Sequence, residues 1–495
     1  MSTGRIVLLV IVVGTALRLA LAAVAGLGYD ESYMLGNARQ FMLSYVDQVP
    51  MHLWMAGLAR VVFHSEASIF VRMPFILMFA GSVWLMYRLT RRLFGERAGL
   101  WAVIAFNLAP VFSVSHSSWI LADGPVIFFL LATANVLARI LFEEVPAYRL
   151  TRWWIWAGVL GGLAILSKYH AILFILGAFV TLLTLPQGRR HLATPGPWLA
   201  AVAAVVVFSP VIIWNVDNHF VGFFFQQKRV EAPALGWQNL AESLLGQIAY
   251  LTPWLIVPFA LALFGAFRRG TSDPKSWFMA MSASGPIFVF TAVMLFAHGF
   301  PHWQMPGWLF TIPLFGRDAA LLAERRPKFA RSYMAVAAVL FAAVIGALVV
   351  QLKTGELVPQ GVVDDNPRID PTLALIDWTP LKAALAARGM LGPDTVAASP
   401  LWMTAGKTSY ALGPDVPVVC VCDDPQHFPY RYDQSQWNGR DVIVVVPKGE
   451  EWMWDVAARF FDSLQPLDPV VIMRGSRPAV TLELRLGKNL HYPGK

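Results

Sequence analysis

Residues 6–27 read IVLLVIVVGTALRLALAAVAGL, an apolar run with a single charge at Arg18. A helix needs about 20 such residues to cross the hydrocarbon layer of a membrane, which is about 30 Å thick. The triplet Ala23-Val24-Ala25 imitates a signal-peptide cleavage site, but the apolar run is longer than that of a signal peptide. We therefore predict an uncleaved first membrane-spanning helix.

Similar runs recur up to Gln351. Of the 495 residues, 57% are hydrophobic and only 14% are charged, whereas a soluble domain carries about 25% charge. We predict about eleven membrane-spanning helices. They cover residues 6–27, 68–89, 98–116, 123–142, 153–168, 169–186, 197–215, 244–267, 278–298, 304–322 and 333–351.

The sequence changes character at Leu352. Short apolar runs then alternate with Asp, Lys, Arg, Gly and Pro, as in a folded α/β module. The predicted fold is a polytopic α-helical membrane protein, with a transmembrane domain at 1–351 and a soluble α/β domain at 352–495. In the latter, one residue separates Cys420 from Cys422, so a mutual disulfide would be strained and a zinc site short of ligands.

Alternate loops of the predicted bundle are basic. The formal net charge of +8 matters less in a membrane protein than the position of each Lys and Arg, since basic loops face the cytoplasm. The N-terminus is then cytoplasmic, and an odd number of spans places the C-terminal domain outside. The basic loop residues are Arg91, Arg92, Arg97, Arg149, Arg152, Arg189, Arg190, Arg268, Arg269, Lys275, Arg325, Arg326, Lys328 and Arg331.

The same alternation of inner and outer loops places other polar residues on the outer face. Their concentration there indicates a site at that face. The first outer loop, residues 28–67, has apolar residues at helical spacing in 34–46 and 51–64, as in helices that lie in the membrane interface. The outer polar residues are Asp30, Glu31, Asp47, His52, His116, Asp123, Lys168, Lys228, Arg229, His298 and His302.

Three of these carboxylates stand next to predicted spans. Asp30 and Glu31 follow the first span, and Asp123 precedes the fourth. A carboxylate at the lipid boundary is costly to desolvate, so it is solvated, paired or functional. The alternative is a helix cap, because Asp is favoured at the N-cap position.

The remaining candidates are cations and metal ligands. Asp47 and His52 flank Pro50 and could ligate a divalent ion, although two ligands do not define a metal site. Lys168 could instead extend to the membrane surface, and Arg229 and His302 could be ordinary loop residues. Cations that face carboxylates at a lipid interface nevertheless suit a lipid-linked phosphate.

These residues occur in an order that resembles the GT-C glycosyltransferases, which use polyprenyl-phosphate sugars. That group includes the protein O-mannosyltransferases and the lipid A aminoarabinose and galacturonic acid transferases. The resemblance covers nearly all of the membrane region, and the C-terminal domain is similar to the periplasmic domains of such enzymes. The motifs are Asp30-Glu31, the segment 47–54, Asp123, Ser167-Lys168-Tyr169, Ser209-Pro210 with Trp214-Asn215, and Pro301-His302-Trp303.

The resemblance implies transfer of a sugar from a polyprenyl phosphate, with inversion, to a lipid, glycan or protein of the cell envelope. We expect the reaction to take place at the outer face of a bacterial inner membrane, with a periplasmic C-terminal domain and no nucleic acid as partner. Asp30 would be the general base, because the attacking hydroxyl must lose a proton. Glu31 and Asp123 would orient the acceptor, the sugar or a cation.

The leaving phosphate needs positive groups beside it, and Lys168, Arg229 and His302 are the candidates. The only cofactor considered is a divalent metal ion at Asp47 and His52. The family's usual Pro-Pro pair is here Val49-Pro50, preceded by Gln48 in place of Lys or His. Gln48 therefore lacks the Lys or His side chain that could contact a phosphate or ligate a metal ion at that position.

Two other function classes fit part of the pattern. A secondary transporter or lipid flippase would also have many spans and intramembrane charges, but its polar site would lie near the midplane. A membrane scaffold would need no acidic residues in its outer loops. The position of the polar residues at the outer edge favours the transferase.

Overall fold

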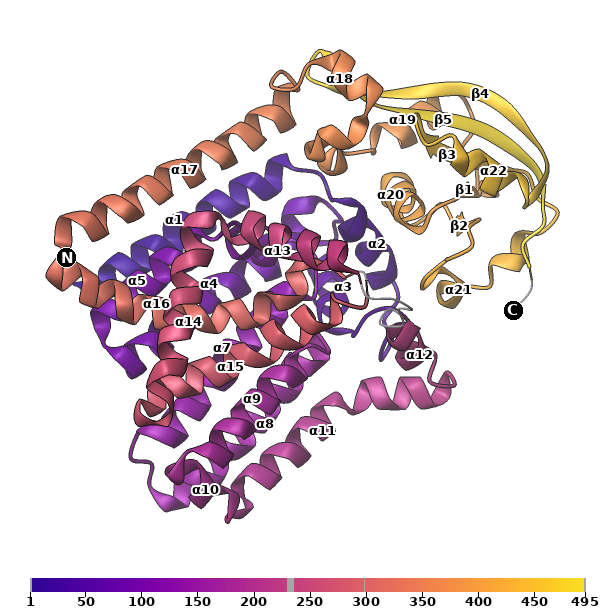
Figure 1. Cartoon of the computed structure of the whole chain (residues 1–495). Helices are drawn as coiled ribbons and strands as arrows, with labels where there is room; N and C mark the ends of the chain where they lie inside the picture. Colours follow the sequence, from indigo (N-terminus) through magenta and orange to yellow (C-terminus); the bar gives the residue numbers. More distant parts are fainter. Residues whose placement is uncertain (1, 229–235, 298, 494–495) are drawn as a thin grey trace. The chain divides into compact units, whose positions relative to one another are not determined.

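A computed structural model describes residues 2–228, 236–297 and 299–493 of the chain (Figure 1). Two compact units are described separately below. The first consists of Met1–Leu19, Met42–His52 and Met73–Phe341, and the second of Ala20–Phe41, Leu53–Arg72 and Ala342–Lys495. The predicted domain boundary at residue 351 stays a prediction, because compactness does not show where lipid ends.

The part of the chain before residue 355 is helical. Its helices are α1 (Thr3–Val24), α2 (Tyr29–Ala38), α3 (Met51–Phe63), α4 (Ser68–Phe94), α5 (Glu96–Leu108), the π-helical turn η1 (Val111–Ser115), α6 (His116–Ser118), α7 (Asp123–Phe142), α8 (Ala147–Ser167), α9 (Ala171–Thr184), α10 (Pro186–Leu192), α11 (Pro195–Asp217), α12 (Val221–Lys228), α13 (Trp237–Leu251), α14 (Pro253–Arg269), α15 (Pro274–Val293), α16 (Met305–Arg325) and α17 (Pro327–Thr354).

Within the described residues, seven helices are long and apolar enough to cross a membrane. Three further pairs of helices bend by 81° to 106° at a short break, which brings the number to ten if each pair is one span. The polytopic helical fold is thus confirmed, with fewer spans by this measure than the eleven predicted. The segment missing from the ten is 304–322, which forms α16.

α16 differs from the other spans in composition. It has 21 residues and is therefore about 31 Å long, which is enough to cross the hydrocarbon layer. Its residues from Met305 to Gly316 are all buried, and Arg317 and Asp318 follow them. A helix that other helices surround does not have to be as apolar as one that faces lipid.

Arg18 is the charge inside α1, and it is fully engaged in the first unit. Its Nε donates to the carbonyl of Ser113 at 3.1 Å, and an Nη donates to the side-chain oxygen of Asn107 at 3.2 Å. The guanidinium also lies 4.4 Å from the ring centre of Phe79. These partners satisfy a cation that would otherwise be costly within the membrane. They also connect α1 to both sides of the bend after α5.

The C-terminal part contains a five-stranded sheet of order β2-β1-β3-β5-β4. β1 is parallel to β2 and β3, with α20 as the crossover between β1 and β2, while β5 is antiparallel to β3 and β4. The predicted α/β module is confirmed. The elements are α18 (Gln360–Asp365), α19 (Pro380–Ala387), β1 (Ala397–Ser399), α20 (Trp402–Leu412), β2 (Val418–Cys420), α21 (Phe428–Arg431), β3 (Val442–Pro447), α22 (Trp452–Ala458), β4 (Phe461–Arg474) and β5 (Arg477–Leu490).

Cys420 and Cys422 form a disulfide at the end of β2. Their Cα atoms are 5.5 Å apart, within the ordinary range for bonded cysteines. The single intervening residue therefore does not prevent the bond, and the strain expected from the sequence stays a prediction. Among the described residues no cysteine is left free.

A buried ion pair fixes the hairpin of β4 and β5 to the end of α17. Arg474 lies 2.8 Å from Asp370, and their side chains are 2% and 0% exposed. Asp370 also accepts hydrogen bonds from the side chain of Gln351 at 2.6 Å and the backbone of Thr372 at 3.0 Å. The carboxylate is thus held by three separate parts of the second unit.

Substitution Arg474→Met should leave Asp370 buried without its cation. We expect the free energy of unfolding to fall by about 3–5 kcal/mol, measured as a lower Tm of the detergent-solubilised protein. The control Lys488→Met removes the cation of an exposed pair with Asp441 and should cost less than about 1 kcal/mol. Equal losses in the two variants would contradict the assignment.

Candidate functional site

Asp123 is the centre of a buried polar cluster in the first unit. It is the first residue of α7, yet its side chain does not cap the helix. Its Oδ1 instead lies 2.8 Å from the Lys168 ammonium and 3.3 Å from the Nε2 of His116. The helix-cap alternative for Asp123 is therefore not what the structure shows.

The break after α5 delivers His116 to this cluster. Pro110 disfavours a helical conformation at Ala109, and α5 ends there at an angle of 81° to the next helical segment. The π-helical turn η1 follows and leads directly into His116. π-helical turns are frequent at functional sites. A Cβ on Gly124 would lie 2.9 Å from the carbonyl of His116, so glycine permits this close approach.

Lys168 reaches the cluster from the end of α8. It is the residue that follows the helix, and its backbone is extended. The ammonium contacts Asp123, and 13% of the side chain is exposed, so the residue is not fully buried. An amine has three N–H donors, and further acceptors can therefore bind. This cation is paired and does not simply extend to the membrane surface.

His52 and His302 lie within electrostatic reach of Asp123, and Asp47 within reach of Tyr169. Burial lowers the pKa of His52 to about 3, so the imidazole is neutral at pH 7. Within the described part of the chain, neither of its ring nitrogens has a hydrogen-bond partner. A neutral buried imidazole with such nitrogens can accept a ligand or a metal ion.

The described residues supply no third ligand for the predicted metal site at Asp47 and His52. In the described ranges, no group of three or more His, Cys, Asp or Glu side chains is placed to hold a metal ion. Asp47 and His52 alone do not make a metal site, and no chemical step below depends on one.

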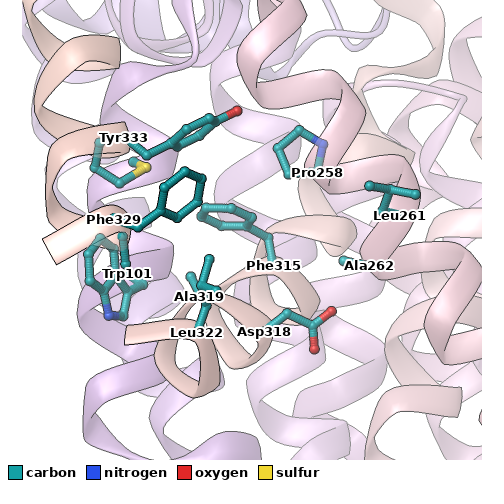
Figure 2. Close-up of a pocket in the computed structure, with 12 residues that line it drawn as sticks. Trp101, Pro258, Leu261, Ala262, Phe315, Asp318, Ala319, Leu322, Phe329 and Tyr333 are labelled. Atoms are coloured by element: carbon teal, nitrogen blue, oxygen red, sulfur yellow. The ribbon is translucent and has the colours of Figure 1, made fainter. Parts of the chain in front are cut away.

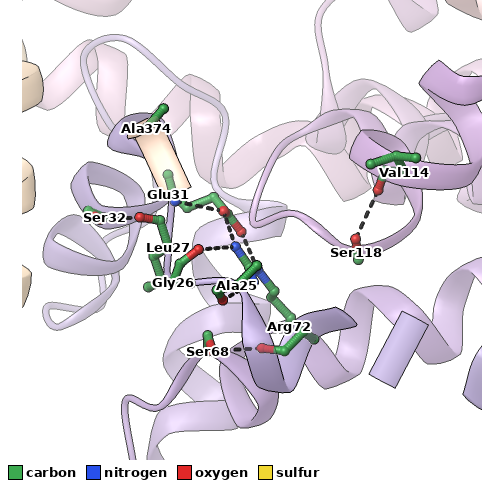
Figure 3. A network of polar contacts seen from close by, with 12 residues as sticks. Ala25, Gly26, Leu27, Glu31, Ser32, Ser68, Arg72, Val114, Ser118 and Ala374 are labelled. Atoms are coloured by element: carbon green, nitrogen blue, oxygen red, sulfur yellow. Dashed lines mark hydrogen bonds and ion pairs between the residues drawn. The ribbon is translucent and has the colours of Figure 1, made fainter. Parts of the chain in front are cut away.

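Two predicted site residues lie in the second unit. Asp30 is exposed on the first turn of α2, whereas Glu31 is buried. Glu31 accepts the N–H of Gly28 at 3.0 Å and forms an ion pair with Arg72 at 2.5 Å. Figure 3 shows this network, in which Arg72 also donates to the carbonyls of Ala25 and Gly26 at 2.8 Å each. Arg229 and His298 lie outside the described residues.

A cavity of about 300 Å³ lies elsewhere in the first unit, among α5, α14, α16 and α17 (Figure 2). Aromatic and aliphatic side chains line it, including Trp101, Phe315 and Tyr333, with Asp318 as the one acidic residue among the described lining residues. None of its lining residues belongs to the polar cluster. We take the polar cluster as the candidate site, because it brings a carboxylate, an ammonium and an imidazole into close contact in a buried place.

The chain is similar to one sequence family and to several solved structures. Residues 47–214 match the dolichyl-phosphate-mannose-protein mannosyltransferase family. The crystal structure of ArnT from Cupriavidus metallidurans bound to undecaprenyl phosphate is similar over 98% of both chains, with 17% identity and a TM-score of 0.63. The chain has the GT-C fold.

Two further solved structures share the GT-C fold. ArnT from the same organism in the apo state gives a TM-score of 0.64 at 14% identity, again over 98% of both chains. The Archaeoglobus fulgidus oligosaccharyltransferase in complex with Zn and sulfate gives 0.52 at 12% identity, over 93% of this chain and 72% of that one. No curated protein matches the chain in sequence. The expected GT-C resemblance is confirmed, and the family match contains Asp47, His52, Asp123 and Lys168.

A double-mutant cycle on Asp123 and Lys168 measures their pairing. Asp123→Asn and Lys168→Met together should cost less than the sum of the single losses, by about 0.5–3 kcal/mol, in thermal unfolding of the solubilised protein. The matched control is Arg97 with Glu324, whose side chains are 75% and 53% exposed, and its coupling should be below about 1 kcal/mol. Additive losses at Asp123 and Lys168 would rule out a functional pair.

Proposed function

We propose that this chain is an inverting membrane glycosyltransferase, which moves a sugar from a polyprenyl phosphate to a lipid, glycan or protein of the cell envelope. The observation that carries the proposal is the Asp123–Lys168 pair with His116, buried within a GT-C fold. The similar ArnT structure was determined with undecaprenyl phosphate bound. That lipid is what remains when a sugar has left an undecaprenyl-phosphate donor.

In the proposed reaction, the acceptor oxygen attacks the anomeric carbon as the bond from that carbon to the phosphate oxygen breaks. The acceptor proton moves to a carboxylate, and we assign this role to Asp30. Two adjacent acids were candidates, and Asp30 is the exposed one, whereas Arg72 already holds Glu31. We therefore propose that Glu31 fixes the loop and does not contact the acceptor.

Lys168 is the proposed partner of the donor phosphate, since a charge-assisted hydrogen bond stabilises the anion that leaves. Asp123 would then hold Lys168 in position with one of its oxygens. His302 and Arg229 remain proposed phosphate contacts. His302 is partly buried, and the role of Arg229 rests on the sequence alone.

The proposed site of action is the outer face of a bacterial inner membrane. The Cys420–Cys422 disulfide supports a periplasmic C-terminal domain, because disulfides persist in oxidising compartments and are rare in the cytosol. The transporter or flippase alternative has less support. The polar cluster is built at helix ends, where Asp123 begins α7 and Lys168 follows α8.

Substitution Asp30→Asn keeps the shape of the side chain but removes the base, so turnover should fall by about 100-fold or more. The assay is sugar transfer from a panel of radiolabelled polyprenyl-phosphate sugars to cell-envelope fractions. Lys168→Met should instead raise the apparent donor KM by about 10- to 100-fold. The exposed variant Asp394→Asn is the control and should match the parent chain.

Normal turnover of Asp30→Asn would remove it as the base. If the parent chain forms no glycosidic bond with any donor in the panel, yet moves a solute or lipid across sealed vesicles, the transporter reading replaces the transferase.

The orientation is tested with Lys448→Cys, an exposed position beyond β3. Because Cys420 and Cys422 are bonded to each other, the new cysteine is the reactive thiol. It should react with an impermeant thiol reagent on spheroplasts, whereas Arg326→Cys, in a predicted cytoplasmic loop, should react only after lysis. The reverse pattern would place the C-terminal domain in the cytoplasm.

A further inference from the structure

The C-terminal domain contacts α2, the helix that carries Asp30, along its whole length. α2 has only 10 residues, and helices shorter than about 12–15 residues are marginal alone in water. All its residues from Glu31 to Ala38 are nevertheless buried. Figure 1 shows α2 beside α20. The position of Asp30 therefore depends on what packs around α2.

Lys407 of α20 holds the turn before α2. Its side chain is fully buried, and its ammonium donates to the carbonyl of Leu27 and, at 2.8 Å, to that of Ala374. The same ammonium lies 5.4 Å from the ring centre of Tyr29. On the other side of the turn, Arg72 binds the carbonyls of Ala25 and Gly26. Three consecutive carbonyls before Asp30 thus each accept a hydrogen bond from Lys407 or Arg72.

Arg431 of α21 holds the far end of α2. Its Nε donates to the side chain of Asn37 at 2.6 Å, and an Nη donates to the carbonyl of Tyr33 at 3.1 Å. The hydroxyl of Tyr33 accepts the backbone N–H of His427 at 2.9 Å. Between the two ends, α20 approaches α2 so closely that a Cβ on Gly406 would lie 2.7 Å from Tyr33.

We propose that Lys407 and Arg431 are positioning residues through which the C-terminal domain places Asp30 for catalysis. This inference rests on Asp30 being the general base of the proposed function. The cations bind backbone carbonyls and an amide, so they fix the course of the main chain and leave the Asp30 side chain accessible. The C-terminal domain then acts on catalysis without contacting the substrate.

The protonation state of Lys407 does not disturb this role. Burial lowers its pKa to about 7, with a smaller contribution from Arg72, while Asp377 and Glu31 act in the opposite direction. Both forms therefore occur near neutral pH. A neutral amine still has two N–H groups for the two carbonyls.

The decisive experiment compares Lys407→Met with Asp30→Asn and with the double variant. Misplacement of a catalytic group by about 1 Å can cost on the order of 100-fold in rate. We expect Lys407→Met to lower kcat by about 10- to 100-fold, with the donor KM changed less than about twofold. When Asp30 is already Asn, the same substitution should have little further effect. If the loss of kcat in the double variant equals the product of the losses in the two single variants, the proposal is overturned.

The control is Gln434→Leu. Gln434 is buried in the same domain and bonds the N–H of Cys420 and the hydroxyl of Tyr492, both outside residues 25–38. It should leave kcat near that of the parent at temperatures where both remain folded. A matching loss of kcat in Gln434→Leu would make the domain merely structural. If Lys407→Met does not fold, Arg431→Lys replaces it, because it keeps the charge and loses the paired donors.

Amide hydrogen exchange separates this inference from the proposed function. Exchange of amides 28–38 should be faster in Lys407→Met than in the parent, and unchanged in Gln434→Leu. If Asp30→Asn turns over normally, the base assignment fails, while the exchange still tests whether Lys407 holds α2. Unchanged exchange in Lys407→Met would overturn the positioning role.

Discussion

The ion pair of Glu31 with Arg72 is the constraint on which the second unit is built. Both side chains are buried, and either charge alone would be strongly unfavourable there. Their geometry therefore has to be kept, and it includes the carbonyls of Ala25 and Gly26 as acceptors for Arg72. Together they determine where the chain goes when it leaves α1, and hence where α2 begins. A rigid support of this kind is what Asp30 would require as the proposed general base.

The two units solve the problem of buried charge in similar ways. In the first, Asp123 is shared between Lys168 and His116, and in the second, Glu31 is shared between Arg72 and the N–H of Gly28. Each carboxylate has several donors, so its lone pairs are largely satisfied without bulk water. The two arrangements differ in how accessible the cation is to a ligand. Lys168 is not fully buried, whereas Arg72 is, and only the first arrangement leaves a cation for a ligand.

The helical framework could be predicted from the sequence because apolar runs of about 20 residues have few alternatives to a membrane helix. The bends could not, since a hydropathy average does not register a break of one or two residues such as Ala109-Pro110. The predicted span at 304–322 formed a helix, but its burial by other helices was not visible in its composition. The α/β character of the C-terminal part was predicted correctly from its alternating pattern.

The candidate site was predicted only in part, for physical reasons. Asp123 and Lys168 could be placed at one membrane face by counting spans, and the structure brings them into contact. The sequence could not tell which of Asp30 and Glu31 is exposed, because neighbouring residues on a helix differ by about 100° in direction and the axis is set by packing. Lys407 and Arg431 were missed because their partners in and before α2 lie more than 370 residues earlier. Arg72 was missed because in the sequence it is one more charge at the start of a predicted span.

The residues that pack on α2 come from a distant part of the chain, and this has a consequence for biosynthesis. The helix is synthesised before the residues that cover it, from Ala374 to Arg431, because these follow it in the chain. Until then this short segment has no packing partners from that domain, and non-local contacts of such separation form slowly. A nascent or truncated chain can therefore insert its helices without completing the loop of Asp30. Under the proposed function, a chain is therefore inactive until its C-terminal domain has been made and has folded.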